Sequence, residues 1–247
     1  IMYPTRKTNI RVIDSLAQVL CDLANSGRRV VLVTSGAIGV GVEKLGLENR
    51  PRDTAGKQAA ATVGQCALMY LYDKMFAQYG RSVGQLLMTK DDVDHANRKQ
   101  NLINAFQKLF DYGAIPIVNE NDAVAVEEIV YGDNDSLSAV VATLVEADAL
   151  VILTETDGLY DANPATNPDA KRISVVEKIT DEIRAMAGGT ATGLGTGGMF
   201  TKVHAAEIAA ESGIPTYIIH GTEPKLVYDL MDGADVGTHF LAGKDFK

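Results

Sequence analysis

The sequence has 247 residues, of which 46% are hydrophobic and 22% are charged, a composition typical of a globular protein with a sizeable core. Its 32 acidic and 23 basic residues give a formal net charge of −9, which argues against nucleic acid as the main partner because phosphate backbones are repelled. The sequence contains no run of about 18 apolar residues and no charged-then-apolar leader, so neither a membrane partner nor secretion is expected.

The two cysteines, Cys21 and Cys66, both fall within apolar helical patterns. We expect them to be reduced thiols in the core, as is usual in a reducing compartment, and we therefore expect a cytoplasmic protein. The sequence opens at Ile1 rather than at a methionine, so we expect the natural N-terminus to lie upstream.

The first part of the chain alternates helical and strand patterns. Apolar residues recur at helical spacing over 10–24, and RRVVLVT (28–34) is a β-branched pattern typical of a short buried strand. This strand runs into TSGAIGVG (34–41). The further elements that we expect are a helix over 55–79, a strand over 83–88, a helix over 97–112 and a strand over 115–119.

The second part continues this alternation. We expect a helix over 136–146, a strand over 149–154, a helix over 199–212, a strand over 214–221, a helix over 224–231 and a last edge strand over 238–241. Strands that alternate with helices predict an α/β fold, with a mainly parallel sheet covered on both faces. No linker or repeat divides the chain, so we expect a single domain over 1–247 with two lobes, about 1–145 and 146–247.

Polar and glycine-rich segments follow three of the expected strands, after Thr34, Val118 and Leu153. Ligands of open α/β sheets bind beyond the carboxyl ends of the strands. In TSGAIGVG, small residues let backbone N–H groups approach an anion, and Ser35 adds a hydroxyl donor. A tight strand-to-helix turn, with glycines needed only for packing, explains the same spacing equally well.

The segment NENDAVAVEEIVYGDNDSLSA (119–139) places two polar clusters around a short amphipathic stretch. Residues 119–122 follow a strand, and residues 133–135 precede a helix that we expect to start near Ser136. Asn side chains donate and accept hydrogen bonds, Asp122 suits an ammonium group, and a carboxylate can orient lysines. Each residue alone is also a common turn former or N-cap, Asp135 included, but together they favour a binding site for a polar ligand.

The segment GLGTGGMFTK (193–202) is rich in glycine and ends in a lysine. Its glycines fit the spacing of a dinucleotide-binding turn, but residues 181–188 before it are helical and no acidic residue ends the next strand. A P-loop spacing is absent as well. A glycine loop that feeds a helix from about Met199, with Lys202 in its first turn, is typical of a phosphate site. A linker with a solvated lysine is the alternative.

Two other classes of enzyme are not favoured. The four histidines show no metal-ligand spacing, and neither an H-E-x-x-H motif nor a G-x-S-x-G elbow occurs. We therefore expect no metal ion that is bound by the protein's side chains alone.

Taken together, five segments resemble the amino-acid kinase family, in that family's order and over nearly the whole chain: VVLVTSGAIGVG, KQAAATVGQ (57–65), IPIVNENDAVA, GDNDSLSA (132–139) and LGTGGMFTK. The resemblance implies a three-layer αβα sandwich with a mainly parallel central sheet. NENDAVA and GDND are most similar to members that transfer the γ-phosphoryl group of ATP, with Mg²⁺, to the side-chain carboxylate of L-glutamate. That reaction is the first step of proline biosynthesis. Feedback inhibition by proline and a homodimer or homotetramer are also implied.

The resemblance further implies roles for residues at matching positions, with the first lobe binding glutamate and the second binding ATP. Lys202 is implied to stabilise charge on the transferring phosphoryl group, and Asp135 to orient the catalytic lysines. The residues implied to bind glutamate are Ser35, Gly36, Ala37, Asn119, Asp122 and Asn134. The residues implied to bind ATP are Thr154, Glu155, Gly195, Thr196, Gly197, Gly198, Met199 and Lys202.

The sequence departs from the family's pattern in three respects. The family's first strand, with its own catalytic lysine, precedes the stretch that matches IMYP, and we expect it upstream of Ile1. Glu155 stands where Asp is more common, and we expect no RNA-binding-like C-terminal domain of the kind that some members carry. Two alternative functions remain: another carboxylate or carbamate kinase of this fold, and a catalytically silent protein that binds glutamate or proline.

Overall fold

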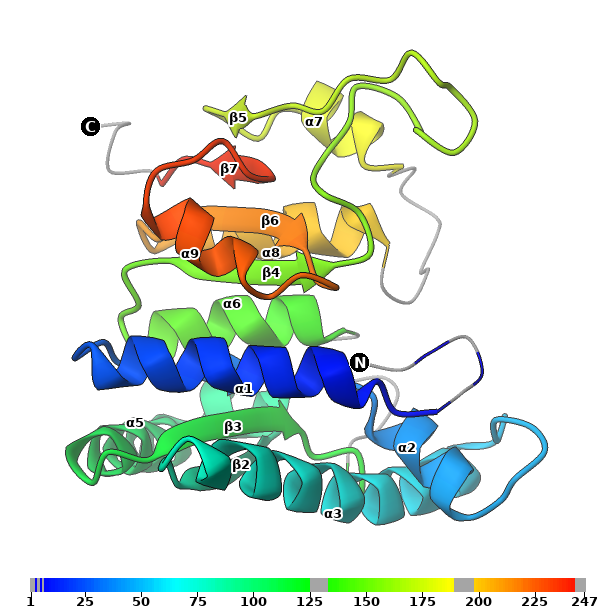
Figure 1. Ribbon diagram of the computed structural model, residues 1–247, viewed down its shortest axis with the longest axis vertical. Helices are drawn as coiled ribbons and strands as arrows, with labels where there is room; N and C mark the ends of the chain where they lie inside the picture. The colour runs from blue at the N-terminus through cyan, green and yellow to red at the C-terminus, as the bar shows by residue number, and fades with distance from the viewer. Residues whose placement is uncertain (1–2, 4, 6, 125–132, 189–197, 243–247) are drawn as a thin grey trace. The chain divides into compact units, whose positions relative to one another are not determined.

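The computed structural model describes residues 3, 5, 7–124, 133–188 and 198–242 of the chain (Figure 1). The chain divides into two compact units, which we call unit 1 (Ile1–Val130) and unit 2 (Tyr131–Lys247), and each has its own sheet. Among the described residues, no helix is both long and apolar enough to cross a lipid bilayer.

Unit 1 contains a three-stranded parallel sheet in the order β1-β3-β2, with helices packed against it and against one another. Its elements are α1 (Ile10–Asn25), β1 (Leu32–Val33), α2 (Ala37–Lys44), α3 (Thr54–Gln78), β2 (Val83–Met88), α4 (Lys90–Asp94), α5 (Ala96–Asp111) and β3 (Ile115–Glu120).

The long helix α3 forms much of the core of unit 1. Its N-cap Asp53 accepts a hydrogen bond from the Gly56 N–H at 2.8 Å. Leu68, Tyr72 and Phe76 recur at helical spacing and are each at most 1% exposed. The Tyr72 hydroxyl lies 2.7 Å from Thr34 Oγ1, directly after β1, and burial raises the pKa of Tyr72 to about 12. This contact holds α3 at the carboxyl end of the sheet.

Unit 2 contains a four-stranded sheet in the order β4-β6-β7-β5, in which only the β6–β7 pair is antiparallel. Helix α8 packs against β4, β6 and α6, and Ala205, Ala206 and Ala209 of α8 are fully buried in this core. The elements of unit 2 are α6 (Asn134–Leu144), β4 (Leu150–Thr154), β5 (Val175–Val176), α7 (Asp181–Met186), α8 (Met199–Glu211), β6 (Thr216–His220), α9 (Leu226–Met231) and β7 (Thr238–Phe240).

The α/β fold with mainly parallel strands is confirmed, and the long helices and buried strands lie within a few residues of their predicted bounds. The last strand, β7, is predicted as an edge strand but lies between β6 and β5. The two-residue strand β5 and the short helix α4 were not predicted, because each is too short to show a periodic pattern.

Helix α6 packs against α8 and β4 within unit 2, and the division into two lobes at about residue 145 stays a prediction. One detail differs from expectation. Cys21 is a buried free thiol as expected, but Cys66 is exposed on α3 and is not a core residue. Helix α3 is apolar on more than one face, so its periodicity did not reveal which side faces solvent.

Candidate active site

The carboxyl end of β1 leads directly into the N-terminus of α2 in unit 1. The Thr34 N–H donates to the Val118 carbonyl at 2.9 Å, which places this turn beside the end of β3. Ser35 is exposed, and Gly36 is the N-cap of α2 with φ 98°, a left-handed conformation that favours glycine. Because Gly36 has no side chain, it does not cap the first-turn amides of α2, and these amides can bind an anion.

The glycines of this region have a packing role as well. A Cβ at Gly41 of α2 would lie 1.8 Å from the Ala60 carbonyl oxygen, and one at Gly64 of α3 would lie 1.7 Å from the Ala37 carbonyl oxygen. Glycines on both helices therefore permit backbone contact between α2 and α3. The explanation of TSGAIGVG as a tight turn with packing glycines is therefore confirmed, since Gly36 shapes the turn and Gly41 is needed for packing, whereas anion binding by this turn stays a prediction.

Asn119, predicted to bind substrate, lies near the end of β3 and is 3% exposed. Its Oδ1 accepts from the Glu120 N–H at 2.9 Å, and its Nδ2 donates to Gln65 Oε1, also at 2.9 Å. The backbone donor fixes the orientation of the Asn119 amide, which in turn fixes that of Gln65. Asn119 therefore holds Gln65 of α3 beside the end of β3, and the sequence did not single out Gln65 as a partner of Asn119.

Asp122 follows β3 and is half-buried. Burial raises the pKa of the Asp122 carboxyl group above its ordinary value, and the guanidinium charge of Arg50 offsets part of this shift. A half-buried carboxylate gains more from an ammonium partner than one in bulk water, so Asp122 has the properties needed to bind an amino group.

In unit 2, the N-terminus of α6 is capped by Asp133 and not by Asp135. The Asp133 carboxylate accepts from the Ser136 N–H at 2.8 Å and from the Ser136 hydroxyl at 3.1 Å. Burial raises the pKa of the Asp133 carboxyl group, and the hydrogen bond from Ser136 N–H opposes that shift. The alternative in which Asp135 is the N-cap is therefore wrong, and its carboxylate is available for other contacts.

Asp135 forms an ion pair with Lys202. Lys202 Nζ lies 3.0 Å from Asp135 Oδ2, and the two side chains are 8% and 19% exposed. Helix α8 begins at Met199 as predicted, which places Lys202 at the end of its first turn. The alternative of a solvated lysine on a linker is thus wrong. A lysine held at this helix N-terminus adds a fixed cation to the positive end of the helix dipole.

The remaining predicted nucleotide residues of unit 2 lie at the ends of elements. Thr154 ends β4, and its carbonyl accepts from the Gly221 N–H at 2.6 Å, while Glu155 is exposed after it. Gly198 is the N-cap of α8 and Met199 its first residue. Asn134, which is predicted to bind glutamate and not the nucleotide, is the first residue of α6. Gly195, Thr196 and Gly197 lie outside the described residues.

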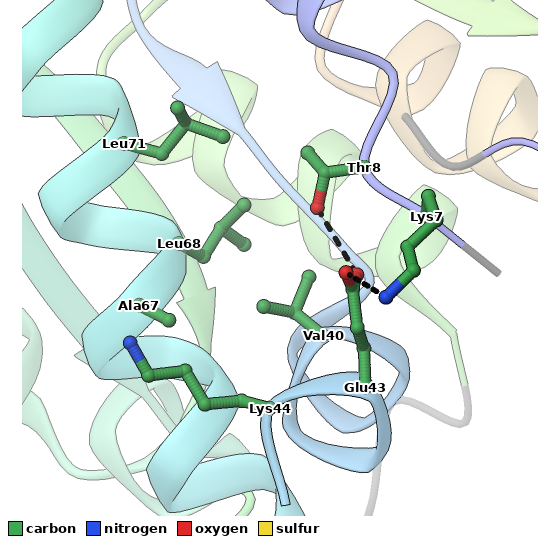
Figure 2. A pocket seen from close by; sticks show the side chains of 8 residues that line it. All are labelled: Lys7, Thr8, Val40, Glu43, Lys44, Ala67, Leu68 and Leu71. Carbon is green, nitrogen blue, oxygen red and sulfur yellow. Dashed lines mark hydrogen bonds and ion pairs between the residues drawn. The ribbon is translucent and has the colours of Figure 1, made fainter. Parts of the chain in front are cut away.

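A pocket of about 320 Å³ lies elsewhere in unit 1, and none of the predicted site residues lines it (Figure 2). The Glu43 carboxylate there pairs with Lys7 at 3.1 Å and accepts from the Thr8 hydroxyl at 3.4 Å. The other lining residues are Val40, Lys44, Ala67, Leu68 and Leu71. Within the described ranges, no group of three or more His, Cys, Asp or Glu residues is arranged to hold a metal ion.

Comparison with protein families and curated sequences supports a phosphotransferase site. Residues 4–220 match the model of the amino acid kinase family. The chain is 48% identical to a glutamate 5-kinase of Clostridium perfringens over 98% of this chain and 91% of that protein. It is 47% identical to a glutamate 5-kinase of Listeria innocua over 99% of this chain and 90% of that protein.

Comparison with solved structures supports the same fold. A carbamate kinase from Giardia lamblia bound to AMP-PNP has a TM-score of 0.67, with 98% of this chain and 94% of that chain covered. Its sequence identity is 16%, so this similarity concerns the fold alone. The fold class implied by the sequence resemblance is thereby confirmed.

Proposed function

This chain belongs to the amino acid kinase family, and from that premise we propose that it is a glutamate 5-kinase. It transfers the γ-phosphoryl group of ATP to the side-chain carboxylate of L-glutamate and forms L-glutamyl 5-phosphate, the first step of proline biosynthesis. Identities of 47–48% over nearly the whole chain to glutamate 5-kinases support this acceptor over others. The structural observation that carries the proposal is the Lys202–Asp135 pair at the N-terminus of α8.

The residues of unit 1 suit the amino acid. Asp122 binds the α-ammonium group of glutamate, since its half-buried carboxylate needs a cationic partner. The first-turn amides of α2, with Ser35, Gly36 and Ala37, bind a carboxylate. Asn119 contributes an amide that the Glu120 N–H orients. Asn134 is included among the glutamate ligands on the family resemblance alone.

The residues of unit 2 suit the nucleotide. Thr154 and Glu155 follow β4, and Gly198, Met199 and Lys202 form the start of α8. We include Gly195, Thr196 and Gly197 in the ATP site on the family resemblance. Mg²⁺ is expected to bind together with the ATP phosphates, because Mg²⁺ is usually held by few carboxylates plus substrate phosphate oxygens.

The reaction needs positioning and charge stabilisation more than a protein nucleophile. An oxygen of the glutamate side-chain carboxylate forms a bond to the γ-phosphorus, and the bond from that phosphorus to the oxygen bridging to the β-phosphate breaks. Lys202 stabilises the negative charge on the phosphoryl oxygens. Asp135 keeps the Lys202 ammonium in place through the 3.0 Å contact.

Substrate specificity tests this proposal. We expect the full-length protein to release ADP from ATP when L-glutamate is present, and to do so poorly with acetylglutamate, aspartate or carbamate. A preference for one of those acceptors would identify another kinase of the same fold. Binding of glutamate or proline without any ADP release would identify a catalytically silent binding protein.

Two further properties belong to the proposal. Proline is expected to inhibit the reaction, because it presents the same α-carboxylate and a cationic amine to the residues around Asp122. A homodimer or homotetramer is expected from the family resemblance. Inhibition of ADP release by added proline and light scattering of the purified protein measure these two properties directly.

A further inference from the structure

Two consecutive residues of α8 contact a single oxygen of Asp135. Asp135 Oδ2 lies 3.0 Å from Lys202 Nζ and 2.7 Å from Thr201 Oγ1. Asp135 lies in the first turn of α6 and Thr201 in the first turn of α8, so the hydroxyl joins the N-termini of two helices within unit 2.

The Thr201 side chain is much shorter than that of Lys202. Its Oγ1 also lies 2.8 Å from the carbonyl oxygen of Gly198, three residues earlier, so its single hydroxyl hydrogen is shared between that carbonyl and Asp135 Oδ2. Lysine, in contrast, carries a point charge on a flexible four-carbon stem. A short β-branched side chain can therefore hold the Asp135 carboxylate with fewer freely rotating bonds than the lysine stem.

We propose that Thr201 is a positioning residue for phosphoryl transfer, an inference that rests on the kinase activity proposed above. Its hydroxyl donates to Asp135 Oδ2 and holds that carboxylate in the orientation that aims Lys202. As charge develops on the phosphoryl oxygens, Lys202 shares its charge with them, and the Thr201 hydroxyl remains as a donor to Asp135. The carboxylate then keeps its position and does not draw the ammonium away.

The test is a kinetic comparison of Thr201→Val with Thr62→Val. Thr62 lies on the exposed side of α3, and its hydroxyl contacts only the backbone carbonyls of Gln58 and Ala59 among the described partners. Both valine variants lose a contact between a threonine hydroxyl and a helix carbonyl, but only Thr201→Val also loses a contact with a carboxylate.

Thr201→Val is expected to lower kcat about tenfold, with KM for ATP and glutamate changed less than about threefold, since a hydrogen bond to a charged group is worth roughly this factor or more. Thr201→Ser keeps the hydroxyl and should retain kcat within about threefold. Thr62→Val should leave kcat unchanged. Thr201→Ala, compared with Thr62→Ala, repeats the comparison with a residue that suits helices better, should the valine variant fold poorly.

A double-mutant cycle with Asp135→Asn shows whether the threonine acts through the carboxylate. In the Asp135→Asn background, Thr201→Val should change kcat by less than about threefold, because the contact partner is already altered. The inference would be overturned if the double variant lost kcat by the product of the two single losses, or if the kcat of Thr201→Val equalled that of Thr62→Val. Either result would leave the proposed kinase activity intact. Absence of glutamate-dependent ADP release by the unaltered protein would instead overturn the proposed function and, with it, the role of Thr201.

Discussion

Replacement of Lys202 by methionine tests the phosphoryl-transfer site most sharply. Methionine keeps a long unbranched side chain but removes the ammonium. The Lys202 side chain is 8% exposed, so its charge acts where solvent screens it weakly. Removing one donor from a comparable charge-stabilising site costs about 2.7–4 kcal/mol, or a factor of about 10²–10³ in kcat. We expect a loss of that size in kcat for Lys202→Met.

The same substitution leaves the Asp135 carboxylate with a neutral neighbour. Breaking a fully buried ion pair costs about 3–5 kcal/mol of stability, and the Asp135 side chain is 19% exposed and still contacts Thr201. We therefore expect the free energy of unfolding to fall by about 2 kcal/mol, near or below the lower limit of that range. Urea unfolding measures this loss separately from catalysis.

The assay is steady-state ADP release, with glutamate affinity measured by direct titration. Lys178→Met serves as the matched control, because Lys178 is an exposed lysine of unit 2 that belongs to none of the contacts described for the site. Glutamate affinity should change less than about threefold in both variants. Near-normal kcat for Lys202→Met, or a loss explained entirely by weaker glutamate binding, would refute the role of this lysine.

Three other changes have expected outcomes. Gly64→Ala would place a methyl group 1.7 Å from the Ala37 carbonyl oxygen. We therefore expect the free energy of unfolding to fall by about 1–3 kcal/mol and KM for glutamate to rise. An unchanged melting temperature would contradict the close packing of α2 on α3. Because burial raises the pKa of Asp122, acidification should protonate it at a higher pH than an ordinary aspartate and raise KM for glutamate there. Asp122→Asn should remove that limb of the pH profile and raise KM at neutral pH, and an unaltered profile would exclude Asp122 as the ammonium ligand. Glu146 has φ 52°, a left-handed conformation in which a Cβ atom is disfavoured and glycine is not. Glu146→Gly should therefore raise the free energy of unfolding by about 0.5–1 kcal/mol, and Glu146→Ala should not. Urea titration measures both changes.

Much of the fold could be predicted from the sequence because its helices and strands are long enough to show their periods. The buried strand β3 and the helix α8 are examples, and the start of α8 at Met199 follows from the glycines before it. The position of β7 inside its sheet could not be predicted, since strand order depends on pairing between distant segments and not on local pattern.

The candidate site was predictable to a different degree in each unit. The Lys202–Asp135 contact joins residues 67 positions apart, and only the family resemblance indicated it. Thr201 lies within the segment expected to bind ATP, but its contact with Asp135 was not predicted, because consecutive residues of a helix point about 100° apart and spacing alone does not suggest that both contact one carboxylate. Gln65 was quoted within KQAAATVGQ, but its contact with Asn119 depends on how α3 packs against the sheet.

Phosphoryl transfer to the glutamate side chain forms an acyl phosphate, which can be trapped directly. Acyl phosphates react with hydroxylamine, so γ-glutamyl hydroxamate should accumulate in equal amount to ADP when the full-length protein is given ATP, Mg²⁺ and L-glutamate. Hydroxamate and ADP formed together at a one-to-one ratio are the predicted result. ADP formed without hydroxamate, or neither product above the glutamate-free control, would contradict the account.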